Sequence, residues 1–146
     1  MEDLHVPPGP GAPRGLVVPA ADLVEQFARS SGPGGQHVNT ADSKVQLRVD
    51  LATTSALDDT QRARALRQLS TRLVGTILQV SVEDHRSQVR NRAIARERLG
   101  QLLREAVTPP VPRRATKPTR GSQRRRLQAK RQRGEIKKNR RRPGQD

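Results

Sequence analysis

The stretch SKVQLRVDL, residues 43–51, has the clearest secondary-structure pattern in the chain. Valine or leucine occupies every second position from Val45 to Leu51, and the residues between them are polar. Because side chains along a β-strand point alternately to its two faces, this pattern predicts a strand with one buried and one exposed face. Such a strand needs partner strands beside it and a helix over its apolar face.

The sequence that follows predicts two helices and another strand. Asp58 and Asp59 offer an N-cap and a first-turn acid for a helix over residues 58–74, which Gly75 is placed to end. Its apolar stripe is Leu66, Leu69, Leu73 and Val74. Residues 78–82 alternate again, as in a strand. Ser87 can cap a helix over residues 87–106, with Ala95, Leu99, Leu102, Leu103 and Ala106 as its inner face. We therefore expect an α+β fold, with a small mixed or antiparallel sheet packed against two helices.

Residues 20–30 carry two conflicting signals. Pro19 followed by Ala-Ala-Asp is typical of a helix start. Leu23, Glu25 and Phe27, however, alternate with their neighbours as in an edge strand. Local propensity leaves both structures open.

The composition excludes several classes of protein. The 146 residues correspond to roughly one domain, on a prior of about 100–200 residues each. The absence of cysteine rules out a disulfide scaffold, a thiol nucleophile and a cysteine-ligated zinc site. With Phe27 as the single aromatic residue, modules that stack bases on aromatic rings are not expected. Apolar runs are short and the start is acidic and proline-rich, so we expect a cytoplasmic protein with no membrane partner.

Charge divides the chain into a nearly neutral body and a basic tail. Residues 113–146 contain 15 Lys or Arg against two acids, a net charge of +13, whereas residues 1–112 carry a net +2. We expect a flexible leader over residues 1–15, a body over 16–106, a Pro-rich linker over 107–118 and a basic tail over 119–146.

The tail is expected to bind RNA, because dense positive charge favours polyanions. Thr119 or Ser122 could cap a helix that Gly134 would stop, and we expect this helix to form only against RNA phosphates, with permanent disorder as the alternative. The cations involved are Arg113, Arg114, Lys117, Arg120, Arg124, Arg125, Arg126, Lys130, Arg131, Arg133, Lys137, Lys138, Arg140, Arg141 and Arg142.

The segment SSGPGGQHVN, residues 30–39, has three glycines within four positions. Glycine exposes bare backbone and permits positive φ, which suits close approach to a ligand. The segment lacks the Gly-Lys-Ser/Thr ending of a phosphate-binding loop and the third glycine of a dinucleotide fingerprint. From local chemistry alone, a plain turn remains the alternative.

The segment resembles the GGQ signature of class I peptide-chain release factors. Residues 45–48 (VQLR) resemble the strand after that signature, and residues 86–92 resemble the family's RSQ-x-x-NR segment. The tail, with KPTR at residues 117–120 and RRRL at 124–127, is similar to that of the short, ArfB-type ribosome-rescue members. The resemblance covers about residues 17–142, and departs from many members at Thr40, where they have lysine. It favours a strand over residues 20–30, and we therefore expect a strand there despite the local helix signal.

The resemblance implies a ribosome-dependent peptidyl-tRNA hydrolase whose catalytic residues are Gly34, Gly35 and Gln36. The glycines would let the main chain enter a crowded RNA pocket, and the Gln36 backbone N–H would donate to the developing oxyanion. The Gln36 side chain would orient water, and in the family this glutamine is often N5-methylated. His37 is expected to pack or hydrogen-bond rather than to transfer protons.

Six further residues are candidates for supporting the GGQ loop or for contacting ribosomal RNA: His37, Asn39, Arg86, Gln88, Asn91 and Arg92. An ordinary solvated helix face is the alternative for the last four. The three histidines have no metal-ligand spacing, so no metal and no cofactor are expected.

The implied function is release of nascent peptides from ribosomes stalled on truncated or non-stop mRNA, without a stop codon. The partners would be the stalled 70S ribosome, its rRNA and P-site peptidyl-tRNA, with the protein a monomer and its tail in the empty mRNA entry channel. Because 146 residues correspond to roughly one domain, we expect none of the codon-reading domains of longer release factors. The alternatives are a non-catalytic ribosome- or RNA-binding protein, a hydrolase of free peptidyl-tRNA, and a release-factor relative that acts on split large subunits.

Overall fold

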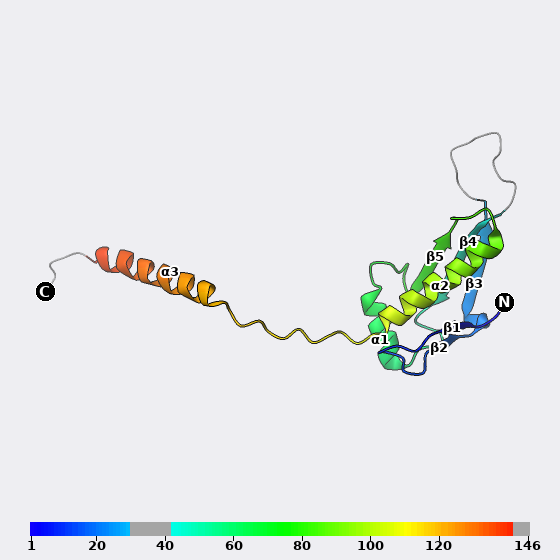
Figure 1. Ribbon diagram of the computed structural model, residues 1–146, viewed down its shortest axis with the longest axis horizontal. Helices are drawn as coiled ribbons and strands as arrows, with labels where there is room; N and C mark the ends of the chain where they lie inside the picture. The colour runs from blue at the N-terminus through cyan, green and yellow to red at the C-terminus, as the bar shows by residue number, and fades with distance from the viewer. Residues whose placement is uncertain (30–41, 142–146) are drawn as a thin grey trace, which may run out of the picture. The chain divides into compact units, whose positions relative to one another are not determined.

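The computed structural model describes residues 1–29 and 42–141, which form two units, Met1–Pro110 and Val111–Asp146. The first unit is built on a three-stranded sheet of β3 (Leu23–Ala28), β4 (Lys44–Asp50) and β5 (Ile77–Val82), in the order β3-β4-β5 (Figure 1). Both pairs of neighbours are antiparallel. The strands predicted at residues 43–51 and 78–82 are confirmed, and β4 lies in the middle of the sheet.

The register of β4 explains its alternating sequence. Val45, Leu47 and Val49 are at most 1% exposed and pair with apolar residues of β5 such as Val80 and Val82. The opposite face of the sheet is polar, and there the Arg48 guanidinium donates to the side chain of Gln79 at 2.7 Å. The sheet thus buries one face and exposes the other, as the period of two requires.

Helix α2 (Gln88–Ala106) covers the apolar face of the sheet, where it packs against β4 and β5 (Figure 1). Its buried residues include Ala95, Leu99, Leu103 and Ala106, as the helical spacing predicted, while Leu102 is partly buried. The hydroxyl of Ser87 caps the helix by accepting from the backbone N–H of Arg90.

Helix α1 (Asp59–Gln68) is shorter than the predicted helix over residues 58–74. Its start is as expected, because Asp58 forms a capping box with Gln61. Its end is not, because the chain turns after Leu69 and Gly75 does not end a helix. Gly75 has a φ of +65° in the turn between Val74 and Ile77, which leads directly into β5.

The prediction of a flexible leader over residues 1–15 is wrong. Strand β1 (Leu4–Val6) pairs antiparallel with β2 (Leu16–Val18), and Leu4 and Val6 are buried in the common core. These side chains pack against α2, which also holds the start of the chain through Arg96, a donor to the carbonyls of Glu2 and Asp3.

Both signals in residues 20–30 proved correct in part. Residues Ala20–Asp22 form a single 3₁₀ turn after Pro19, and the strand β3 begins at the next residue. β3 is an edge strand of the sheet, as its alternation with polar residues suggested. The helix-start signal at Pro19 therefore corresponds to a single turn, and the residues after it form a strand because they pair with β4.

The second unit contains the helix α3 (Arg120–Asn139). Thr119 caps it by accepting from the backbone N–H of Ser122, as predicted. The helix continues through Gly134, so the prediction that this glycine stops it is wrong. No residue of α3 is buried. Among the described residues of the whole chain, no helix is long and apolar enough to cross a membrane.

Candidate functional site

The GGQ triplet lies on the connection between β3 and β4. Gly34, Gly35, Gln36, His37 and Asn39 fall within residues 30–41, which are outside the described residues. The two ends of the connection are described: Ala28 is the last residue of β3 and pairs with Lys44, the first residue of β4. The candidate site is therefore built here from the residues that contact these two ends.

Asn91 is the buried centre of these contacts. It lies in the first turns of α2 and is fully buried. Its side-chain nitrogen donates to the carbonyl of Ser43 at 2.7 Å and to that of His85 at 2.6 Å, and its oxygen accepts from the backbone N–H of His85 at 2.9 Å. A buried amide with three hydrogen bonds fixes its neighbours firmly, because losing one partner would leave a polar group unsatisfied.

Gln88 binds the adjacent backbone. Its side-chain nitrogen donates to the carbonyl of Asp42 at 2.8 Å. Gln88 is the first residue of α2, and Asn91 lies three positions later on the same side of the helix. Together they attach both residues that precede β4, Asp42 and Ser43, to the start of this helix.

Arg92 attaches the same helix to the other strand. Its Nε lies 2.7 Å from Oε1 of Glu25, in the middle of β3. The Glu25 side chain is only 5% exposed, and that of Arg92 is 43% exposed. Two weaker ion pairs lie nearby: Arg29 with Asp42 at 3.9 Å, between the two ends of the connection, and Lys44 with Glu83 at 3.4 Å.

The sequence-predicted residues thus divide into two groups. Gln88 and Asn91 bind the two residues that precede β4, and Arg92 pairs with Glu25 of β3. Arg86 is exposed. Sequence reasoning missed Glu25 as the partner of Arg92. Its position was nevertheless informative, because a carboxylate between Leu23 and Phe27 on the inward side of a strand needs a cationic partner.

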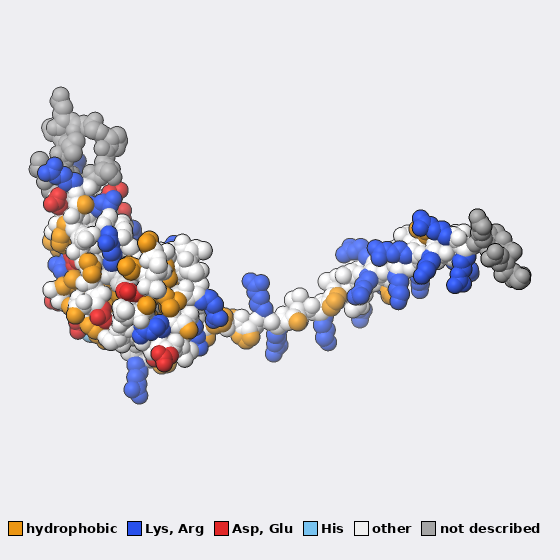
Figure 2. Space-filling model, turned by 180° about the vertical axis from the view of Figure 1, so that it is seen from behind, with side chains coloured by type: hydrophobic (Ala, Val, Ile, Leu, Met, Phe, Trp, Pro, Cys, Tyr) orange, Lys and Arg blue, Asp and Glu red, His pale blue; other side chains and the backbone are white. Residues whose placement is uncertain are grey.

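The tail presents positive charge without an apolar face. Arg124, Arg125 and Arg126 are consecutive, so their side chains point to different sides of α3. Figure 2 shows Lys and Arg side chains along this unit. The other predicted cations of α3 are exposed as well, as are those between residues 113 and 119 and at 140–141, while Arg142 lies outside the described residues.

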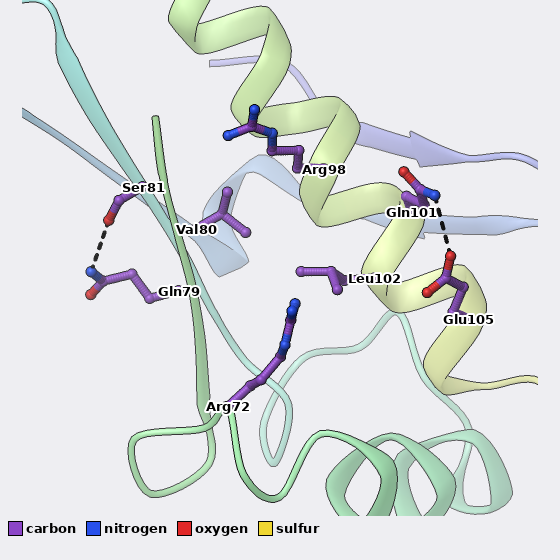
Figure 3. Close-up of a pocket in the computed structure, with 8 residues that line it drawn as sticks. All are labelled: Arg72, Gln79, Val80, Ser81, Arg98, Gln101, Leu102 and Glu105. Carbon is purple, nitrogen blue, oxygen red and sulfur yellow. Dashed lines mark hydrogen bonds between the residues drawn. The ribbon is translucent and has the colours of Figure 1, made fainter. Parts of the chain in front are cut away.

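A cavity of about 380 Å³ lies at the outer edge of β5, beside α2 (Figure 3). Its lining polar groups partly bind one another: Gln101 donates to Glu105 and Gln79 donates to Ser81, both at 3.2 Å. The remaining lining residues are Arg72, Val80, Arg98 and Leu102. Leu102 is about 17 Å along α2 from Asn91, at about 1.5 Å per residue. None of the predicted site residues lines this cavity, so it is not part of the candidate site.

The fold and these contacts define the class of protein: a small α+β domain that carries Gly-Gly-Gln between the first two strands of an antiparallel sheet, followed by a cationic helix. The family model described as "RF-1 domain" matches residues 13–140. The chain belongs to this family of release-factor domains.

Individual relatives agree with this assignment. The chain is 37% identical over 121 residues to "Peptidyl-tRNA hydrolase ArfB" of Pseudomonas putida, which covers 82% of this chain and 88% of that protein. It is 43% identical over 65 residues to "Peptide chain release factor 1" of Geotalea uraniireducens, covering 40% of this chain and 18% of that protein. It is 32% identical over 94 residues to "Large ribosomal subunit protein mL62" of Mus musculus, covering 64% and 46%.

Proposed function

We propose that this protein is a ribosome-dependent peptidyl-tRNA hydrolase that releases nascent peptides from stalled ribosomes. The observation that carries the proposal is the likeness to a peptidyl-tRNA hydrolase along 82% of the chain, together with a Gly34-Gly35-Gln36 triplet on the β3–β4 connection. The partners would be the 70S ribosome, its rRNA and the P-site peptidyl-tRNA. We expect the protein to act in the cytoplasm as a monomer.

The proposed reaction is hydrolysis of the ester that joins the peptide to the terminal ribose of its tRNA. A water oxygen attacks the ester carbonyl carbon, the bond from that carbon to the ribose oxygen breaks, and the ribose oxygen takes up a proton. The products are a peptide with a free carboxyl group and a tRNA with a free hydroxyl group. Gln36 would donate its backbone N–H to the oxyanion, a contribution typically worth about 3–4 kcal/mol.

The glycines and the Gln36 side chain have separate roles in this proposal. Gly34 and Gly35 carry no Cβ, so the main chain can approach the ester closely. The Gln36 amide is not basic and would orient the attacking water instead of removing its proton. The terminal ribose and the ribosome would supply the proton transfers.

The tail would recognise ribosomes whose mRNA ends near the P site. The 15 cations of residues 113–142 would occupy the mRNA entry channel when mRNA no longer fills it. The predicted linker over residues 107–118 begins later than expected, because Val107 is buried and the first unit extends to Pro110. Residues 111–118 would span roughly 25 Å when extended, at about 3.1 Å per residue, and so connect the body to α3. Repulsion among neighbouring arginines opposes α3 in water, so we expect its helix content to rise when RNA neutralises them.

A peptide-release assay on ribosomes programmed with truncated mRNA tests the proposal. We expect the wild-type chain to release peptide, and Gln36→Ala and Gly35→Ala to release it far more slowly. Wild-type release by Gln36→Ala would overturn the catalytic assignment. Ribosome binding without any release would favour a non-catalytic RNA-binding protein, and release from free peptidyl-tRNA would favour a ribosome-independent hydrolase.

A second arm tests the tail. A chain that ends at Pro112 keeps the body and removes all 15 cations of residues 113–142. We expect it to lose release activity on truncated mRNA. Full activity of this variant would refute the proposed role of the tail and leave the enzymatic assignment intact.

A further inference from the structure

One short stretch of α2 binds the residues at the end of the GGQ-bearing connection and the middle of the strand that precedes it. Gln88 and Asn91 hold the carbonyls of Asp42 and Ser43, which precede β4. Arg92 holds Glu25 on β3. We propose that Gln88 and Asn91 are positioning residues, which set the placement of Gln36 through the backbone of Asp42 and Ser43. This inference rests on the proposed function.

The short distance along the chain makes this coupling effective. Only five residues separate Gln36 from Asp42. A displacement of about 1 Å in a reacting geometry can reduce the rate about 100-fold, so a backbone shift at Asp42 matters even though Asp42 does not touch the ester. The ion pair between Arg92 and Glu25 resists movement of β3, the other strand that leads to Gln36.

The exposure of each side chain on this segment indicates whether it can contact RNA. Asn91 is 0% exposed, so its amide cannot reach a ribosomal nucleotide. Gln88 is exposed, but its side-chain nitrogen is already used by the Asp42 carbonyl. Arg86 and Arg90 are exposed on the same segment and are available for phosphate contacts, and the Arg92 side chain is partly exposed there.

The chain offers a matched control for Gln88. The Gln68 side-chain nitrogen donates to the carbonyl of Thr108 at 3.1 Å, and Gln68 is also exposed on a helix end. Gln88→Glu and Gln68→Glu both replace the amide donor with an oxygen of similar size, and both lower the net charge by one. Both variants therefore share the loss of charge and the loss of one surface hydrogen bond. A difference in rate between them reports the position of Gln88.

The experiment compares these variants in the peptide-release assay with the full-length chain. For Gln88→Glu we expect the rate at saturating protein to fall at least tenfold, with a half-saturating concentration within about twofold of wild type. Gln68→Glu should keep the wild-type rate. A glutamate suits the start of α2 better than the end of α1, because the helix dipole is positive at its N-terminus. Thus Gln88→Glu should melt no lower than its control.

The outcomes separate this inference from the proposed function. If the wild-type chain releases no peptide, the proposed function fails. If wild type is active and Gln88→Glu keeps its rate, the positioning role alone is refuted. A wild-type rate with a raised half-saturating concentration would also refute it, because that pattern indicates a binding contact. Asn91→Asp, which removes the buried donor, should lower both the rate and the melting temperature, and a wild-type rate would count against the proposal; if it does not fold, the Gln88 pair still decides.

Discussion

At the scale of single residues, the pair of Arg92 and Glu25 is unequal in its exposure. The carboxylate is nearly buried, whereas the guanidinium side chain is close to half exposed. Neither carboxylate oxygen of Glu25 has a hydrogen-bond donor among the described residues, so its contact with Arg92 is an ion pair without a well-directed hydrogen bond. Removing the charge of Arg92 should therefore destabilise the fold more than removing that of Glu25. The first change leaves an uncompensated buried charge, whereas the second leaves a partly exposed charge that water can hydrate.

We predict that Arg92→Met destabilises the protein by about 1–3 kcal/mol, and that Glu25→Gln costs less than about 1 kcal/mol. Methionine keeps the aliphatic stem of Arg92, so the change isolates its charge. Urea unfolding of both variants and of the double variant measures the difference, and the double variant should be more stable than Arg92→Met alone. Equal costs for the two single changes would contradict this reading of the pair.

Asp50 supplies a second prediction at this scale, which concerns pH. The Thr76 hydroxyl donates to Oδ1 of Asp50 at 2.7 Å, and the Ala52 backbone N–H donates to the same oxygen at 3.0 Å. These hydrogen bonds, with that from Thr76 foremost, lower the pKa of Asp50 below its ordinary value. A carboxyl group whose folded-state pKa is lowered stabilises the fold above its unfolded pKa, and this contribution is lost as pH falls through the folded pKa.

We therefore expect Thr76→Val to melt below wild type at neutral pH, with the difference shrinking as the pH falls below about 4. Valine preserves the shape of threonine and removes the hydroxyl. Calorimetry across this pH range measures the two melting temperatures. A difference that stays constant down to pH 2 would mean that Thr76 acts through packing instead of through Asp50.

At the scale of secondary-structure elements, the β1–β2 segment depends on one close backbone contact. A Cβ on Gly11 would lie 1.9 Å from the carbonyl oxygen of Val107, the C-cap of α2, and 2.3 Å from its carbonyl carbon. Neither backbone atom can move without shifting the end of this helix. Glycine at position 11 therefore permits the leader to pack there, although proline and glycine in this region suggested flexibility.

Gly11→Ala should consequently lower the melting temperature by roughly 5–15 °C, the size of shift that 1–3 kcal/mol of overpacking gives in a domain of this size. Gly134→Ala is the matched control, because nothing lies within 4 Å of a Cβ at that position in α3. The control should leave the melting of the first unit unchanged and raise the helix content of the tail. Equal melting temperatures for both variants would contradict the close contact.

How far an element could be predicted depended on whether its signal was local. β4, β5 and α2 follow from the period of their apolar residues. The end of α1 could not be predicted in this way. Val74 continues the apolar spacing of the helix in the sequence, but it is 77% exposed in the turn before β5. The packing of β1 depends on Gly11 meeting Val107, which lies 96 positions away and leaves no local trace. Within the candidate site, the sequence indicated Gln88, Asn91 and Arg92, but their partners Asp42, Ser43 and Glu25 lie far along the chain and could not be derived from local patterns.

At the scale of the whole molecule, the two units differ in burial and in net charge. The first unit has a folded core and a net charge that is nearly balanced over residues 1–112. The second unit has no buried residue in its helix and contains most of the net charge. We therefore expect the stability of the fold to depend on the first unit and affinity for polyanions to depend on the second. A change in one unit should leave the property of the other nearly intact.

This separation predicts the salt dependence of ribosome binding. If about eight tail cations contact phosphates, the logarithm of the binding constant should fall against the logarithm of salt concentration with a slope of about −6 to −7. The chain that ends at Pro112 should bind much more weakly and with a slope closer to zero, because each lost phosphate contact removes the release of roughly one counterion. Its melting temperature should match that of the full chain. Binding measured at several salt concentrations checks both slopes. A full-chain slope near zero would show that shape complementarity of the body, and not the charge of the tail, supplies the affinity.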